Sequence, residues 1–210
     1  MKSLFILLTT TFLNPGTFDD AKYIETMKKT IDAMYGSKSI EEYQQVINTL
    51  QRIGAAEKTR WEPFYYSAFG YVMMANLEQT PVSRDGYLDQ ALNAVNEARK
   101  RTHDESEVTA LEGFIHMIRV TVDPASRGQQ YSGMAFQAFG KAVAHNPENP
   151  RALALKAQME YGMAQFFGSS TEQACSTMAQ ALEKFDTFVS ENPLAPVWGR
   201  GMAESIEQCK

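Results

Sequence analysis

The chain has 210 residues, of which 44% are hydrophobic and 21% charged, a composition typical of folded proteins that argues against disorder. Its formal net charge of −5 gives no electrostatic reason to expect a nucleic acid or an anionic membrane as partner. A chain of this length can bury a substantial core as one large domain or two small ones.

The first residues have the outline of a secretory signal peptide. Lys2 is followed by a short run of apolar and hydroxyl residues that ends near Leu13, just before an Asn-Pro-Gly break. The run is too short to span a bilayer, which takes about 20 apolar residues. No A-x-A pattern precedes Asp19, so a buried N-terminal segment of a cytoplasmic protein is the alternative. We expect a signal peptide over 1–18, an exported (periplasmic or secreted) protein, and no membrane span in the mature chain.

Helical periodicity begins at Asp20, and we expect this first helix to end at Gly36. Ser39 and Glu42 then predict a capping box, in which a serine side chain and a glutamate three residues later bind the free backbone N–H groups of the next helix. Three further helix pairs follow the same outline. They open at Trp61, Ser106 and Pro150.

Two series of residues recur along the chain at nearly equal intervals. The first position of each second helix recurs after 48, 44 and 46 residues, and the central position of each first helix after 43, 43 and 44. Two series with similar periods indicate one repeated helix pair. The first series is Tyr43, Ala91, Ala135 and Ala181, and the second is Met27, Gly70, Gly113 and Ala157.

The best-preserved copy has Ala135, Phe139, Ala142 and Pro147 at offsets of 0, 4, 7 and 12. This spacing of small, aromatic, small and proline residues resembles the second helix of a tetratricopeptide (TPR) repeat. Through its leader and its Trp61–Tyr66, Val122–Tyr131 and Pro193–Gly199 stretches, the chain also resembles small exported TPR-like proteins of Bacteroidetes-type bacteria. The resemblance implies an all-α solenoid (a TPR-like α-α superhelix) over 19–210, with about four expanded helix pairs, that binds or scaffolds a partner.

A short capping helix is expected at the C-terminus, with Trp198, Met202 and Ile206 covering the apolar end of the stack. Cys175 begins the last repeat's second helix and Cys209 ends the cap. If the two helices run antiparallel at about 1.5 Å per residue, both cysteines reach the same level. In an exported protein this favours a disulfide. The alternative is one buried thiol and one exposed thiol.

Each copy exceeds the ~34 residues of a standard TPR by about ten, and we expect the extra residues in loops between the two helices of a pair. Two of these stretches share a Pro-x-Ser-Arg sequence, at 81–84 and 124–127. Equivalent loops of stacked repeats lie on one edge, so their arginines should be neighbours. Either the serines are helix N-caps, or the edge binds a carboxylate or a sugar acid. The edge residues are Ser83, Arg84, Ser126, Arg127 and Tyr131.

In TPR geometry the first helices line a concave groove. Its aromatic and methionine side chains would suit an extended peptide or an amphipathic helix, although such residues also form the core between repeats. The expected groove residues are Phe64, Tyr71, Met74, Phe114, Met117, Arg151, Gln158 and Tyr161.

The sequence contains none of the standard catalytic or nucleotide-binding motifs, and His103, His116 and His145 lack metal-ligand spacing. We therefore expect no catalytic residue, no metal site and no cofactor. The favoured function is a non-catalytic binding or scaffold protein of the cell envelope with a protein or peptide partner. The alternative is an accessory protein that binds glycan or peptidoglycan. A glycosidase on a helical toroid ranks last, because no paired inward carboxylates are visible.

Overall fold

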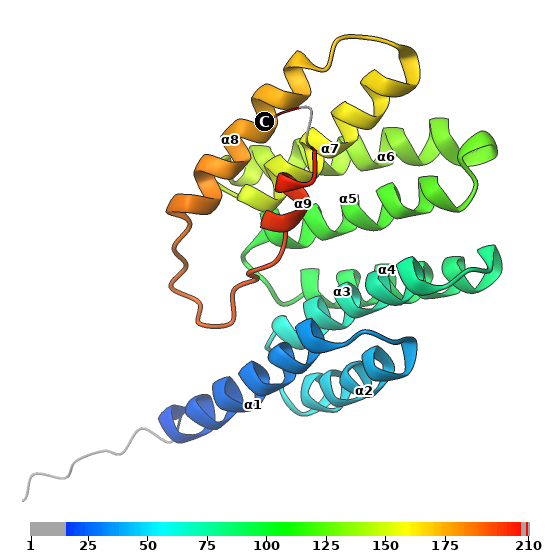
Figure 1. Ribbon diagram of the computed structural model, residues 1–210. Coiled ribbons are helices and arrows are strands. Elements are labelled where there is room, and N and C mark those ends of the chain that lie inside the picture. The colour runs from blue at the N-terminus through cyan, green and yellow to red at the C-terminus, as the bar shows by residue number, and fades with distance from the viewer. Residues whose placement is uncertain (1–15, 207–208, 210) are drawn as a thin grey trace, which may run out of the picture.

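The computed structural model describes residues 16–206 and residue 209. The expected all-α fold of four helix pairs and a short terminal helix is confirmed (Figure 1). Of the expected leader, residues 1–15 lie outside the described residues, and 16–18 fall within the first helix. The helices are α1 (Gly16–Gly36), α2 (Ile40–Ala56), α3 (Glu62–Leu77), α4 (Pro81–Arg99), α5 (Glu105–Val122), α6 (Pro124–His145), α7 (Pro150–Phe167), α8 (Glu172–Thr187) and α9 (Arg200–Glu204).

The two helices of each pair run antiparallel, and the pairs stack on one another (Figure 1). Among the described residues, successive odd-numbered helices pack against each other, whereas successive even-numbered helices make few or no such contacts. The stack is therefore tighter on the side of α1, α3, α5 and α7, and we call this side the inner face. None of the helices within 16–206 has both the length and the apolar character needed to cross a membrane.

Side chains cap the starts of several helices. The Glu42 N–H donates to the Ser39 hydroxyl, and the Glu42 carboxylate accepts from the Lys38 N–H, which confirms the cap expected for α2. Asp104 and Asn149 cap α5 and α7 in the same way, with backbone N–H groups donating to their side-chain oxygens.

The Pro-x-Ser-Arg stretches are the first turns of α4 and α6, and the prediction that they are loops was wrong. Proline is favoured at the first helical position because its fixed φ suits the helix and its missing N–H would have no partner there. Ser126 is not an N-cap either, since Asp123 caps α6 by accepting from the Ser126 N–H. Ser83 likewise lies inside the first turn of α4, after the N-cap position Thr80.

The extra residues of each repeat therefore lengthen helices instead of loops. Only three, three, one and four residues separate the helices of the four pairs, at 37–39, 78–80, 123 and 168–171. The longest helix, α6, has 22 residues. Long helices extend the edge at which the two helices of each pair meet, and this edge carries the pocket described below.

Glycine at the central position of a first helix permits close packing, within a pair for Gly113 and between neighbouring pairs for Gly70. A Cβ on Gly113 would collide with the ring of Phe139, and a Cβ on Gly70 would lie 2.8 Å from the Met34 methyl group. Gly113 and Phe139 are members of the two repeat patterns in the sequence, so the repeat register corresponds to a real contact between α5 and α6.

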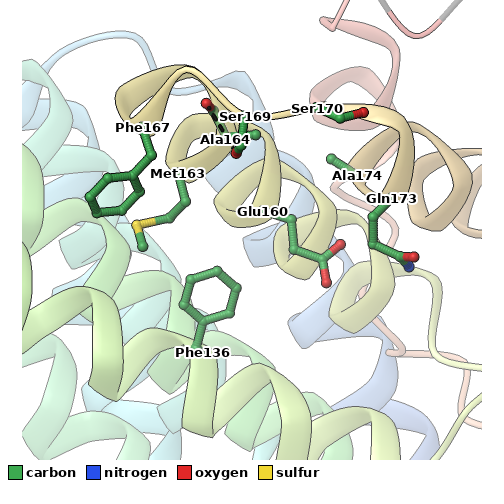
Figure 2. Close-up of a pocket in the computed structure, with 9 residues that line it drawn as sticks. All are labelled: Phe136, Glu160, Met163, Ala164, Phe167, Ser169, Ser170, Gln173 and Ala174. Carbon is green, nitrogen blue, oxygen red and sulfur yellow. Dashed lines mark hydrogen bonds between the residues drawn. The ribbon is translucent and has the colours of Figure 1, made fainter.

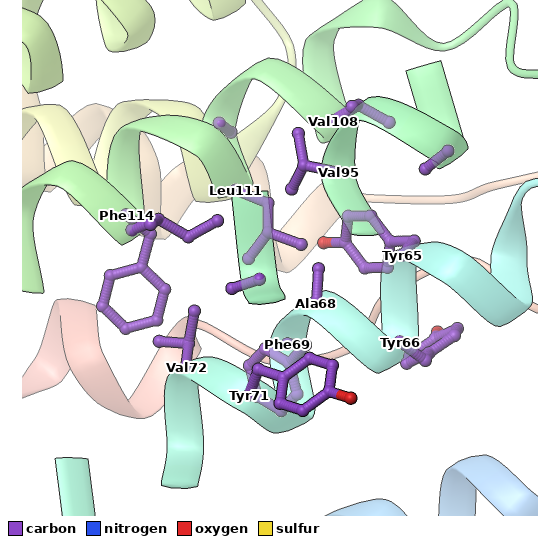
Figure 3. Close-up of a cluster of buried hydrophobic side chains, with 14 of the residues drawn as sticks. Tyr65, Tyr66, Ala68, Phe69, Tyr71, Val72, Val95, Val108, Leu111 and Phe114 are labelled. Atoms are coloured by element: carbon purple, nitrogen blue, oxygen red, sulfur yellow. The ribbon is translucent and has the colours of Figure 1, made fainter. Parts of the chain in front are cut away.

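The main core extends from α1 to α7, and α3, α4 and α5 meet near its middle. Figure 3 shows Tyr65, Val95 and Leu111 converging there from the three helices, and all three are essentially inaccessible to solvent. Helix α3 is buried on nearly every side, so another part of the chain must cover its inner face. The segment that covers it comes from the C-terminus.

Candidate functional site

Residues 188–199, between α8 and α9, lie across the inner face, and we call them the C-terminal segment. Figure 1 shows this stretch leaving α8 and returning to α9 in front of the helix stack. The Trp198 ring packs against Phe69 of α3 and Phe114 of α5, with ring centroids 5.1 and 5.7 Å apart. Its indole N–H donates to the Tyr65 hydroxyl at 3.1 Å. The expectation that Trp198 covers the end of the stack was therefore wrong, because it fills the middle of the inner face.

Polar side chains of the inner face also bind the main chain of this segment. The Tyr66 hydroxyl donates to the Leu194 carbonyl at 2.8 Å, and the Val197 N–H donates to the Tyr35 hydroxyl at 3.4 Å. The Leu194 side chain is only 2% exposed. Both apolar anchors and main-chain hydrogen bonds thus hold the segment.

A buried ion pair lies beneath the segment. The Arg151 guanidinium of α7 donates to both carboxylate oxygens of Glu107 on α5, with Nε 3.0 and 2.9 Å from them. Arg151 also lies over the Phe188 ring, 4.6 Å from its centroid. Burial raises the pKa of Glu107, and the contact with Arg151 opposes that rise. Burial also raises the pKa of Tyr65 well above its ordinary value, so its hydroxyl keeps its proton and donates to Glu107.

The eight expected groove residues do not form one free surface. Phe114 and Arg151 lie under the C-terminal segment, and the Gln158 amide donates to the carbonyl of Met202 in α9. Met74 is buried, while Met117 and Tyr161 are half-buried. The remaining two side chains point elsewhere: the Tyr71 hydroxyl accepts from Gln51 of α2, and Phe64 lies under Arg101.

A disulfide joins Cys175 of α8 to Cys209, with their Cα atoms 4.9 Å apart. The bond closes a loop that contains the whole C-terminal segment. Gly199 makes the turn into α9 with a φ of +106°, and a Cβ there would meet Arg151 Cγ at 2.9 Å. Glycine is required at this position because the backbone is left-handed and the space beside it is filled.

Arg84 and Arg127, from the two Pro-x-Ser-Arg stretches, hold neighbouring repeats together. Arg84 donates to the Ala75 carbonyl of α3 and to Thr121 of α5. Arg127 donates to both oxygens of Asp85, at 2.7 Å each. The Tyr131 ring packs against His116, at 6.1 Å between centroids. The structure therefore places both guanidinium groups in contacts within the chain.

A pocket of about 260 Å³ opens between α6, the end of α7 and the start of α8 (Figure 2). Figure 2 shows the Met163 side chain extending between the rings of Phe136 and Phe167. The other residues that line the pocket are Glu160, Ala164, Ser169, Ser170, Gln173 and Ala174.

Two phenylalanine rings at the end of α7 project into solvent, and one of them, Phe167, lines the pocket. Phe166 is 81% exposed and Phe167 is 67% exposed, and the two rings contact each other edge to face. They end α7, because Gly168 adopts a left-handed φ of +63° that terminates the helix directly after them. Sequence reasoning did not select these residues. The signal that could have found them is the Phe-Phe pair directly before Gly-Ser-Ser.

The chain is similar in structure to the HusA haemophore from Porphyromonas gingivalis. The TM-score is 0.78, the sequences are 28% identical, and the match covers 90% of this chain and 92% of that chain. Neither the protein-family models nor the curated proteins compared with the chain give a match. The likeness is to a small all-helical binding protein of a Bacteroidetes bacterium and not to an enzyme. The resemblance to TPR proteins rests on the residue pattern and the paired helices.

Proposed function

We propose that this chain is an exported, non-catalytic binding protein that holds a flat, mainly apolar ligand between α6, α7 and α8. A porphyrin is the first ligand class to test. The single observation that carries this proposal is the exposed ring of Phe167, which lines an open pocket and contacts the exposed ring of Phe166. Large apolar side chains exposed beside a hollow are typical of ligand sites.

The size of the pocket favours a ligand that is only partly enclosed. Its volume of about 260 Å³ lies just below the range of small-molecule sites, which is about 300 to 1,000 Å³. A planar ring system could enter with one edge against Phe136 and Met163 and stack one face against the Phe167 ring. Aromatic contacts of this kind contribute about 0.5–1.5 kcal/mol beyond the burial of apolar area.

The side chains of the pocket fit a porphyrin ring more completely than they fit its iron. Among the described residues, no histidine or cysteine lines the pocket. Met163 carries a thioether, which is one of the iron ligands found in haem proteins. Glu160 already accepts from Thr177 at 2.9 Å and forms an ion pair with Lys156 at 3.2 Å. We infer that contacts with the porphyrin ring supply most of the affinity and that Met163 is the residue that would coordinate the iron.

The comparison supports this choice of ligand class, since the structurally similar protein is named a haemophore. Export is supported by the disulfide, because such bonds persist in oxidising compartments. The glycan alternative has less support, because Arg84 and Arg127 are engaged within the chain.

A titration followed by absorbance tests the proposal, with haemin and with metal-free protoporphyrin IX. Both should bind saturably. Phe167→Ala should weaken both by about tenfold through the lost ring contact. Met163→Leu should alter only the haemin spectrum. Val197→Ala is the matched control and should bind both ligands as the wild type does. Val197 is also exposed, at 73%, but it lies on the C-terminal segment and does not line the pocket. Absence of saturable binding, or equal binding by Phe167→Ala and wild type, would overturn the proposal.

A further inference from the structure

The C-terminal segment has the contacts of a bound peptide. It contains no helix, and it buries Leu194 and Trp198, which are four residues apart. Tyrosine hydroxyls bind its main chain at Leu194 and Val197. Side-chain pockets combined with main-chain hydrogen bonds are the usual means by which proteins recognise extended peptides.

The residues that receive the segment belong to the helix pairs themselves and are held by one another. The Tyr35 ring packs edge to face against Tyr66 and Phe69, with centroids 6.3 and 6.0 Å away. Tyr65 is fixed by its hydrogen bond to buried Glu107. These contacts do not involve the C-terminal segment, so the indole site between α3 and α5 is formed by the repeats.

Parts of the segment project into solvent. Val189 is 90% exposed and Val197 is 73% exposed, although the Val197 N–H donates to the Tyr35 hydroxyl. A cavity of about 220 Å³ lies between the segment and the turns that connect the helix pairs, and Asp104, Glu107 and Asn192 are among the residues that line it. The segment is thus anchored at a few points and bridges a polar cavity between them.

The disulfide fixes both ends of the segment to the same helix. Cys175 lies in α8 before the segment, and its partner Cys209 follows α9. While the bond is closed, the segment stays within a loop of the chain, at a high effective concentration beside the inner face.

We propose that the inner face is a binding site for an extended peptide with a leucine four residues before a tryptophan, and that residues 188–199 occupy it in cis. The Cys175–Cys209 disulfide keeps this internal occupant in place. Reduction of the bond by a dithiol, which is itself oxidised to a disulfide while Cys175 and Cys209 become thiols, makes the site available to a second peptide of the same chemistry. This site is separate from the pocket of α6, α7 and α8, so the two proposals can fail independently.

The test uses the full chain with Trp198→Ala and a fluorescein-labelled synthetic peptide of residues 191–200, followed by fluorescence anisotropy. The peptide should bind this variant saturably and should not bind the oxidised wild type. A peptide with alanine in place of the tryptophan should bind at least about 30-fold more weakly, as expected for a tryptophan at the centre of an interface. Dithiothreitol should tighten peptide binding to the variant, because the tethered segment then competes less.

Two further variants locate the site. Phe114→Leu, added to Trp198→Ala, should weaken peptide binding because it removes a ring that the indole contacts. Phe167→Ala, added in the same way, is the matched control and should leave peptide binding unchanged, since Phe167 lines the other pocket. A folded Trp198→Ala protein that does not bind the peptide, or binds both peptides equally, would overturn the proposal.

A second experiment, with a cleavable variant of the protein, tests the proposal if Trp198→Ala does not fold. A site for a specific protease is inserted after Ser190, and the wild-type chain is folded, oxidised and then cut. The fragment that begins at Glu191 should remain attached by the disulfide until dithiothreitol is added, and excess peptide should then displace it. Retention of the fragment under reduction with excess peptide, or unfolding of the remaining chain on its release, would contradict the proposal.

Discussion

Glu107 and Arg151 are charged side chains that lie almost entirely inside the protein, with side-chain exposures of 5% and 1%. Charges of this kind are stable in an interior only when each satisfies the other. The pair also joins four parts of the chain, because Glu107 contacts Tyr65 of α3 and Arg151 contacts Phe188 of the C-terminal segment. Its main contribution is therefore to hold α3, α5, α7 and the segment in one arrangement.

Replacing one partner of this pair should be strongly destabilising. Glu107→Gln leaves the Arg151 charge buried without a counter-charge, and we expect the free energy of unfolding to fall by about 3–5 kcal/mol. Urea denaturation followed by circular dichroism measures the change. The double variant Glu107→Gln/Arg151→Met should recover part of the loss, because it removes the unpaired charge. A double variant less stable than the single one would show that the pair is not the cause.

Glycine substitutions give a matched test of helix packing at the residue scale. A methyl group on Gly113 would strike the Phe139 ring, whereas one on Gly140 of α6 would meet no neighbouring atom. We expect Gly113→Ala to lower the free energy of unfolding by about 1–3 kcal/mol through overpacking. Gly140→Ala should raise it by up to about 1 kcal/mol, because alanine is the better helix former. Equal effects in urea denaturation would contradict the proposed contact.

At the scale of elements, the short helix α9 depends on its packing against α7 and α8 and on the disulfide that follows it. Helix α9 has five residues, too few to be stable without tertiary contacts. The bond between Cys175 and Cys209 closes a loop with a sequence separation of 34. A cross-link over such a loop restricts the unfolded chain and thereby stabilises the fold.

Cys175→Ser/Cys209→Ser should lower the free energy of unfolding by about 3–4 kcal/mol in the chain-entropy model. Wild type in dithiothreitol should lose the same amount, and the variant should not respond to dithiothreitol. Urea denaturation of the four samples gives the comparison. A variant as stable as the oxidised wild type would show that the bond contributes little to stability.

At the scale of the whole molecule, the repeat pattern was enough to predict four helix pairs, because small and aromatic residues at fixed spacing determine how two helices pack. The contact of Gly113 with Phe139 shows this directly. The Pro-x-Ser-Arg stretches were misplaced because proline both follows loops and starts helices, and the sequence alone did not separate the two roles. The C-terminal segment could not be predicted, because Trp198 meets Phe69 and Phe114 across more than 80 residues.

The candidate site was harder to predict than the fold for the same reason. Arg151 was predicted to line an open groove, but it is buried in an ion pair with Glu107, which is 44 positions away and lay in no motif. The pocket of α6, α7 and α8 depends on where α7 ends. Helix α7 ends at Gly168, which leaves Phe166 and Phe167 exposed instead of packed.

The central claim, that a porphyrin enters the pocket between α6, α7 and α8, is tested most directly by nuclear magnetic resonance of methionine methyl groups. Protoporphyrin IX is added to protein labelled with ¹³C at these methyls, and the Met163→Leu variant assigns the signal of Met163. The ring current of a bound porphyrin should shift the Met163 methyl strongly and leave Met27 in α1 unchanged. A shift at Met27 with none at Met163, or no shift at either, would contradict the proposed site.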